Sequence, residues 1–183
     1  MERNVVRTFL YPTFLDPPPS LAFSDQFAFH PSGSTSVAII SLLHTVINLL
    51  QFNPFVVVIS LDFSQAFDTI RHSTLLSKLA ELDLPTPVYN WLVDFFSGHS
   101  HHTCSVEMSR APEASQPVSY GWSIGSAAYT VTAADFRPLN PDNIFIKFVD
   151  NTYLVISIAN ISTRAAEIDN TAACAAENNL KLN

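Results

Sequence analysis

Large apolar residues recur every three or four positions in one segment near the N-terminal third of the chain: Val37, Ile40, Leu43, Ile47 and Leu50. This spacing predicts a helix over residues 36–50 that packs in the core, with Ser34 or Thr35 as its N-terminal cap. Asn53-Pro54 ends it. The segment is shorter than the roughly 20 apolar residues that a membrane-spanning helix needs.

Continuous apolar runs follow in three places and predict strands. Residues 55–61 read FVVVISL, a β-branched run typical of a strand that is buried on both faces. Residues 144–148 and 153–158 predict two more strands, which a tight turn at residues 149–152 joins.

The remaining elements are helices and loops. Asp68 is a suitable cap for a helix that reaches Pro85, and further helices are predicted over residues 87–96, 126–136 and 162–179. A short apolar segment, residues 4–11, precedes a proline-rich loop, and residues 99–117 form a polar, irregular stretch or hairpin. Helices that alternate with buried strands indicate an α/β or α+β domain.

Composition narrows the class of protein. A chain of 183 residues fits one domain, or most of one, and with 48% apolar and 14% charged residues we expect it to be ordered. Four glycines leave no phosphate-binding loop or dinucleotide fingerprint. Residues 1–4 lack the apolar core of a signal peptide, so we expect an intracellular protein, nuclear or cytoplasmic, without a membrane partner.

Charge and cysteines limit the partners. Nine Lys and Arg residues face sixteen Asp and Glu residues, for a net charge of −7, and the basic residues form no run. Because phosphate contacts come from clustered cations, this segment should bind nucleic acid only weakly by itself. The stretch with His99, His101, His102 and Cys104 lacks the second pair of ligands that a structural zinc site has, so a polar hairpin tip is the better interpretation.

Three aspartates stand where chemistry could occur. Asp62 ends the apolar strand, Asp68 follows six residues later, and Asp150 lies in the turn between the two later strands. Carboxylates at the ends of buried strands are costly unless they meet a cation or hydrogen-bond donors, and Mg²⁺ prefers such oxygens. The alternative is that Asp62 and Asp68 cap helices and that Asp150 is an ordinary turn residue.

Five segments resemble, in order, the motifs of reverse transcriptases from non-LTR (LINE-type) retrotransposons. They are DQFAFHPSGST at 25–35, LDFSQAFDTIRH at 61–72, YGWSIGS at 120–126, FVDN at 148–151 and NNLKLN at 178–183. The resemblance implies an α+β fingers–palm fragment with a small antiparallel palm sheet packed on helices and no thumb. Residues 1–183 would form a single domain fragment, with about 1–54 fingers-like and 55–183 mostly palm, truncated within its last motif.

The resemblance also implies roles for individual residues. Asp62 would bind both catalytic Mg²⁺ ions, and Asp150 would be the hairpin carboxylate opposite it. Phe67 would lie beneath the incoming sugar, Phe63 would carry its backbone past the triphosphate, and Gly121 would let the chain approach the template and primer. The implied partners are an RNA template, a DNA primer and deoxynucleoside triphosphates.

Several positions depart from the family pattern. They are Gln65 for Lys, Asn151 for the second hairpin Asp, His30 for an Arg near the triphosphate, Tyr120 for Gln, Trp122 for a small residue, and Ser126 for Pro. These changes predict an RNA-directed DNA polymerase fragment with impaired nucleotidyl transfer at Asp62, Asp150 and Asn151. A catalytically inactive relic that acts at most as a binding module is the alternative. An unrelated two-metal phosphotransferase is disfavoured by the order of the motifs.

Overall fold

The structure, a computed structural model, describes residues 2–29, 33–64, 70–98 and 124–182. In it, helices pack around a small antiparallel sheet. An α+β domain is therefore what the sequence predicts and what the structure has. The elements in chain order are α1 (Glu2–Val5), the π-helical turn η1 (Val6–Leu10), α2 (Tyr11–Thr13), α3 (Thr35–Leu50), β1 (Val56–Ser64), α4 (His72–Glu81), α5 (Thr86–Gly98), α6 (Ile124–Thr132), the 3₁₀ turn η2 (Ala133–Asp135), β2 (Ile144–Phe148), β3 (Asn151–Ser157), the 3₁₀ turn η3 (Ile158–Thr163), α7 (Arg164–Glu177) and β4 (Lys181–Leu182).

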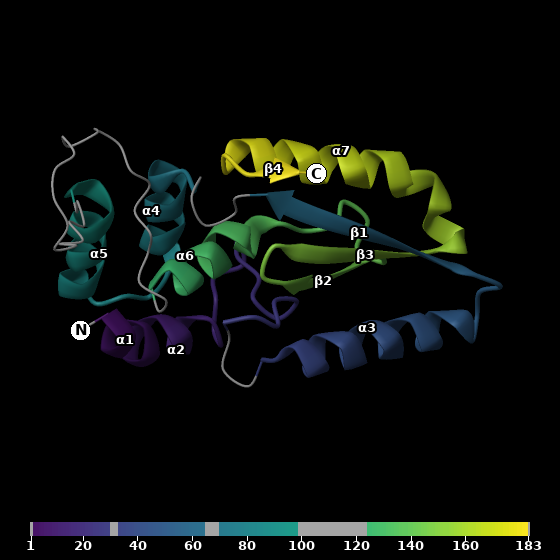
Figure 1. Cartoon of the computed structure of the whole chain (residues 1–183), viewed down its shortest axis with the longest axis horizontal. Helices are drawn as coiled ribbons and strands as arrows, with labels where there is room; N and C mark the ends of the chain where they lie inside the picture. Colours follow the sequence, from purple (N-terminus) through teal and green to yellow (C-terminus); the bar gives the residue numbers. More distant parts are fainter. Residues whose placement is uncertain (1, 30–32, 65–69, 99–123, 183) are drawn as a thin grey trace, which may run out of the picture.

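The sheet has the strand order β2-β3-β1-β4, with every neighbouring pair antiparallel. Figure 1 shows it between α3 and α7, while α1, α2, α4 and α5 gather beyond one end. The predicted hairpin between β2 and β3 is confirmed. Its turn is tighter than the sequence indicates, because Phe148 already pairs with Asn151 and leaves only Val149 and Asp150 between the strands.

Two groups of buried apolar side chains hold these layers together. The larger one joins the first helices with α4, α5 and α6 and includes Phe63 at the end of β1. The smaller one belongs to the sheet and consists of Leu61, Phe145, Leu154 and Ile156. The end of β1 therefore links the sheet to the helical core.

Helix α3 begins as predicted, because the Ser34 hydroxyl accepts a hydrogen bond from the Val37 backbone N–H at 3.2 Å. Its predicted buried face is wrong. The five residues at helical spacing are all exposed, with Ile40 at 64% and Ile47 at 59%, and Ala38 is the one residue of the helix that is buried. The helix is apolar on both sides and carries no charged residue, so periodicity alone does not choose a face. The side with the small Ala38 approaches the sheet.

Strand β1 is also less enclosed than its sequence predicts. Leu61 and Phe63 are buried, but Val58 is 42% exposed and Phe55, just before the strand, is 49% exposed. The prediction of a strand buried on both faces is therefore wrong for its first half. The register places Val58 opposite Val155, on the face that α3 approaches. Helix α3 contacts β2 and β3 more than β1, and so leaves this part of β1 open.

Other sequence predictions fall close to the observed elements. The predicted helices over 87–96, 126–136 and 162–179 correspond to α5, to α6 with η2, and to α7, and the segment over 4–11 is helical. Asp68 and the stretch from His99 to Cys104 lie outside the described residues. Within the described part of the chain, no helix is long and apolar enough to cross a membrane.

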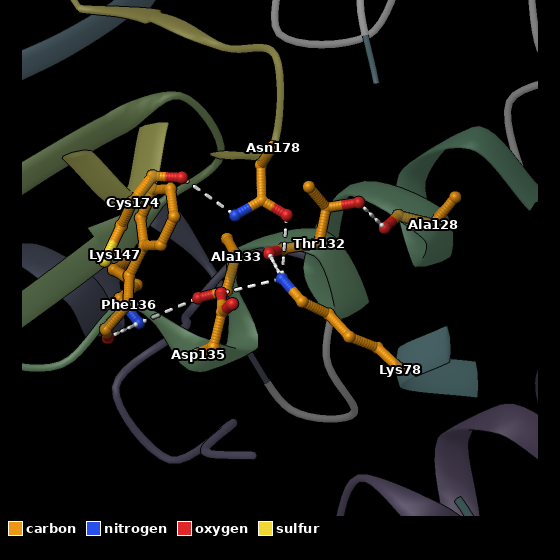
Figure 2. Close-up of polar contacts among 9 residues, drawn as sticks. All are labelled: Lys78, Ala128, Thr132, Ala133, Asp135, Phe136, Lys147, Cys174 and Asn178. Carbon is orange, nitrogen blue, oxygen red and sulfur yellow. Dashed lines mark hydrogen bonds and ion pairs between the residues drawn. The ribbon is translucent and has the colours of Figure 1, made fainter. Parts of the chain in front are cut away.

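Two buried lysines bind the C-terminal end of α6 and η2 to the rest of the core (Figure 2). The Lys78 ammonium lies 2.7 Å from the Asp135 carboxylate and donates to the Thr132 carbonyl and to Asn178 Oδ1. The Lys147 ammonium lies 2.9 Å from the Asp25 carboxylate. It also donates to the carbonyls of Ala133 at 3.1 Å and Phe136 at 2.6 Å.

Burial lowers the pKa of both lysines below the usual value for an ammonium group, while Asp135 beside Lys78 and Asp25 beside Lys147 raise it. Cations near the C-terminal carbonyls of a helix are favourably placed. A buried charge is tolerated only when its partners are present, so these lysines fix the elements that supply those partners.

We expect the outward face of α3 to tolerate polar substitution. Ile40→Gln and Ile47→Gln should each change the free energy of unfolding by no more than about 0.5 kcal/mol, because both side chains are already in water. Leu154→Ala, in the sheet core, should cost about 2–5 kcal/mol. Urea unfolding followed by circular dichroism measures all three; a loss above about 1.5 kcal/mol for either glutamine variant would show that this face is covered.

Lys147→Met should destabilise the domain by about 3–5 kcal/mol, since it leaves the partly buried Asp25 carboxylate without its cation and frees two helix-end carbonyls. Arg164→Met, at an exposed position in the first turn of α7, is the control and should have little effect. Equal unfolding midpoints for the two variants would contradict a structural role for the Lys147 charge.

Candidate active site

Asp62 and Asn151 face each other across neighbouring strands. They are Cα partners in the register of β1 and β3, at the end of the sheet where the β2–β3 hairpin turns. Side chains opposite each other in an antiparallel pair lie on one face with Cβ atoms about 4.5–5.5 Å apart. The side chains of Asp62 and Asn151 are exposed, and Asp150 is half-buried. Asp62 is therefore a strand residue, and the helix-cap interpretation of it is wrong.

Asp150 is joined to this pair by the turn. The Asn151 amide Nδ2 donates to the Asp150 carboxylate Oδ1 at 3.3 Å. Val149, the first turn residue, has φ 56°, the left-handed conformation that tight hairpins require at this place. The turn and the β1–β3 pairing thus bring Asp62 to the same end of the sheet as Asp150 and Asn151, which lie almost 90 residues later in the chain.

The buried phenol of Tyr129 on α6 is affected by both carboxylates. Burial raises the pKa of its phenol above the usual value, and the negative charges of Asp150 and Asp62 raise it further. Electrostatic effects of this kind fall off steeply with distance in salt solution. Both charges therefore act on the same buried phenol, and we call Asp62, Asp150 and Asn151 the acidic site.

The oxygen atoms at this site suit a hard divalent cation. Two carboxylates and the Asn151 side-chain carbonyl are the kind of ligands that Mg²⁺ takes, with water and substrate phosphates completing the coordination. Among residues 2–29, 33–64, 70–98 and 124–182, no group of three or more His, Cys, Asp or Glu side chains is arranged to hold a metal. Asp62 and Asp150 are the two carboxylates at this end of the sheet.

Of the other residues discussed for the site, two are buried and the rest lie outside the described residues. Phe63 is buried, and its ring packs on Phe136 with centroids 5.5 Å apart, so its side chain belongs to the core while its backbone follows Asp62 directly. His30, Phe67, Tyr120 and Gly121 lie outside the described residues, as do Gln65 and Trp122. Ser126 is buried in the first turn of α6, where its carbonyl accepts from the Thr130 hydroxyl.

The sequence did not predict which residues stabilise the β2–β3 hairpin through contacts with β2 and the turn. Asp25 and Gln26 lie beside Lys147 on β2, two residues before the turn, and their side chains contact Lys147 and Val149. Lys147 could have been noticed, because a single lysine inside the apolar run IFIKFV must be either exposed or paired. Its partner, more than 100 residues earlier, carries no such signal.

The sequence of this chain was compared with models of protein families and with curated proteins. A family model described as "Reverse transcriptase (RNA-dependent DNA polymerase)" matches residues 6–183, which include both strands of the acidic site. A search of curated proteins gave no match. Since the match covers almost the whole chain, including Asp62 and the hairpin with Asp150, the chain belongs to the reverse transcriptase (RNA-dependent DNA polymerase) family.

Proposed function

We propose that this chain is a fingers–palm segment of a LINE-type reverse transcriptase whose nucleotidyl transfer is impaired at Asn151. The observation that carries the proposal is the position of Asp62 opposite Asn151, with Asp150 in the adjoining turn. Family membership supplies the reaction class, RNA-directed DNA synthesis. The LINE-type ancestry rests on the five ordered motifs, of which LDFSQAFDTIRH at 61–72 is the longest.

Asp62 and Asp150 are the residues that would hold divalent ions, for which Mg²⁺ is the expected species. Paired ions at such a site stabilise the attacking and leaving oxygens of phosphoryl transfer. Asp62 lies on β1 and Asp150 lies in the turn just before β3, so the ladder between β1 and β3 brings the two carboxylates to the same end of the sheet. The backbone after Asp62 would run past the triphosphate, while the Phe63 ring stays fixed in the core and keeps that backbone in place.

Asn151 weakens this site in two ways. An amide has no charge to neutralise a cation, so the site keeps two negative charges instead of three. The Asn151 Nδ2 also donates to Asp150 Oδ1, which occupies one of the oxygens that a cation would use. Both effects lower the affinity for the metal, and the loss of charge also reduces stabilisation of the transition state.

The RNA template, the DNA primer and the nucleotides are the proposed partners, and the surface charge limits how firmly this segment holds them. Two of the three lysines, Lys78 and Lys147, are buried in ion pairs and cannot reach a phosphate. The cations left at the surface of the described residues are Arg3, Arg7, Arg71, Arg137, Arg164 and Lys181. We therefore propose that further basic surface is needed for tight binding.

A restored carboxylate should improve catalysis. Asn151→Asp should raise primer extension on an RNA template with Mg²⁺ by at least about tenfold, since changes at metal sites commonly alter affinity 10–100-fold. Asn48→Asp, an exposed position on α3 away from the hairpin, is the matched control and should change nothing. Asp62→Asn in the Asn151→Asp background should abolish the gain. If extension is equal with Asp or Asn at 151, the explanation by the missing carboxylate is wrong, and if no variant extends a primer, a binding module becomes the better proposal.

Binding to an RNA–DNA hybrid should be weak and depend little on salt. We expect a dissociation constant no tighter than about 10⁻⁵ M near physiological ionic strength, in the non-specific range. The slope of log K against log salt should correspond to about two phosphate contacts or fewer, because the surface cations are scattered. Fluorescence anisotropy at several salt concentrations measures both quantities. Nanomolar binding with a steep slope would contradict the scattered arrangement of surface cations.

A further inference from the structure

We infer that Gln26 is a positioning residue for the acidic hairpin, by which we mean the β2–β3 hairpin with Asp150 in its turn. Gln26 positions this turn by accepting a hydrogen bond from the Val149 backbone N–H. The inference deepens the proposed function and rests on it in one respect, that the hairpin binds divalent cations. Gln26 itself does not reach the carboxylates by any described contact. It acts through the turn that carries Asp150, and three features of the structure support this role.

The first feature is the backbone around Gln26. The segment Asp25-Gln26-Phe27 lies along the end of β2, where the Lys147 N–H donates to the Asp25 carbonyl and the Phe27 N–H donates to the Lys147 carbonyl, each at 2.8 Å. Gln26 and Lys147 form an isolated parallel bridge. This segment therefore extends the sheet by one short edge, immediately before the turn at Val149 and Asp150.

The second feature is the side chain of Gln26, which is only 4% exposed. Its Oε1 accepts from the Ala28 N–H at 3.0 Å and from the Val149 N–H at 3.3 Å. Its Nε2 is buried, and no hydrogen-bond partner for it occurs among the described residues. An unpaired buried Nε2 costs free energy. We therefore infer that glutamine is favoured at this position because its Oε1 accepts two backbone hydrogen bonds.

The third feature is the strain in the turn. Val149 has φ 56°, and a β-branched residue in this left-handed region costs roughly 1–2 kcal/mol, which is why glycine usually stands there. A turn with this strain stays closed only when surrounding contacts hold it. The Gln26 carbonyl binds the strained residue itself, and Asp150 is the next residue in the chain. Loss of that contact should let the turn open and move Asp150 away from Asp62.

A double-mutant cycle separates positioning from general stability. Gln26→Met removes the acceptor and keeps a long, unbranched side chain, while Val149→Gly removes the strain that makes the acceptor necessary. Asn143→Leu is the matched control: Asn143 is another buried amide, bonded to Glu167 and Thr163, and its loss should destabilise the domain without touching the hairpin. Should Gln26→Met fail to fold, Gln26→Asn keeps the amide but is one methylene too short to span to Val149.

Two readouts are needed, one of them independent of metal. The first is hydrogen exchange at the Asn151 amide, which reports whether the ladder is closed at the Phe148–Asn151 pair beside the turn. The second is the dissociation constant for Mn²⁺, from the free ion seen by electron paramagnetic resonance. Gln26→Met should speed the exchange at Asn151 at least about tenfold over that at Leu154 and weaken Mn²⁺ binding about tenfold. In the Val149→Gly background both effects should nearly vanish.

Several results would overturn the inference. Unchanged exchange at Asn151 would show that Gln26 does not hold the turn. Equal effects of Gln26→Met with Val or Gly at position 149 would show that strain relief is not its role, and an equal loss of Mn²⁺ affinity in Asn143→Leu would reduce the effect to general destabilisation. If the unaltered protein binds no Mn²⁺ at millimolar concentration, the proposed metal site fails, and the exchange cycle alone still decides whether Gln26 anchors the hairpin.

Discussion

The buried ammonium of Lys147 is the interaction on which the arrangement of this domain depends. It meets the Asp25 carboxylate and the carbonyls of Ala133 and Phe136, so one side chain ties an N-terminal segment and the end of η2 to strand β2. A buried charge that lost any of these partners would be costly, which makes the three parts mutually dependent. The turn that carries Asp150 begins two residues later, at Val149. Its position relative to α6 is therefore set by a contact that takes no part in the chemistry proposed for it.

Much of this fold could be predicted from the sequence, because the strong signals are local. The apolar runs around VDNT specify two strands and a tight turn, and the aspartate at the end of FVVVISL reaches the same end of the sheet through antiparallel pairing. Local patterns fail where a segment is apolar on every side. Helix α3 offers two hydrophobic faces, and only the fit of Ala38 against the sheet, a tertiary property, decides which one is covered.

Supporting contacts could not be predicted because they join residues far apart in the chain. Gln26 and Val149 are separated by 123 positions, and the bond between them depends on a backbone φ that valine seldom adopts. The sequence around Gln26 and around Val149 contains no pattern that would predict a contact between them. Asp25 and Gln26 open the segment DQFAFHPSGST, in which the resemblance gives a role to His30 alone, so the sequence does not indicate the sheet edge that they form.

The asparagine at position 151 would, under the proposed function, separate the requirements of the fold from those of the chemistry. Asparagine has nearly the shape of aspartate, so the β1–β3 register and the turn are kept, and its amide donates to Asp150. An aspartate there would place a third negative charge beside Asp62 and Asp150, a repulsion that only bound cations relieve. In the metal-free state the amide is thus the more stabilising residue. Selection for a folded domain alone would retain Lys147 and Gln26 and would favour asparagine at 151, whereas selection for polymerisation would favour the carboxylate at the expense of stability.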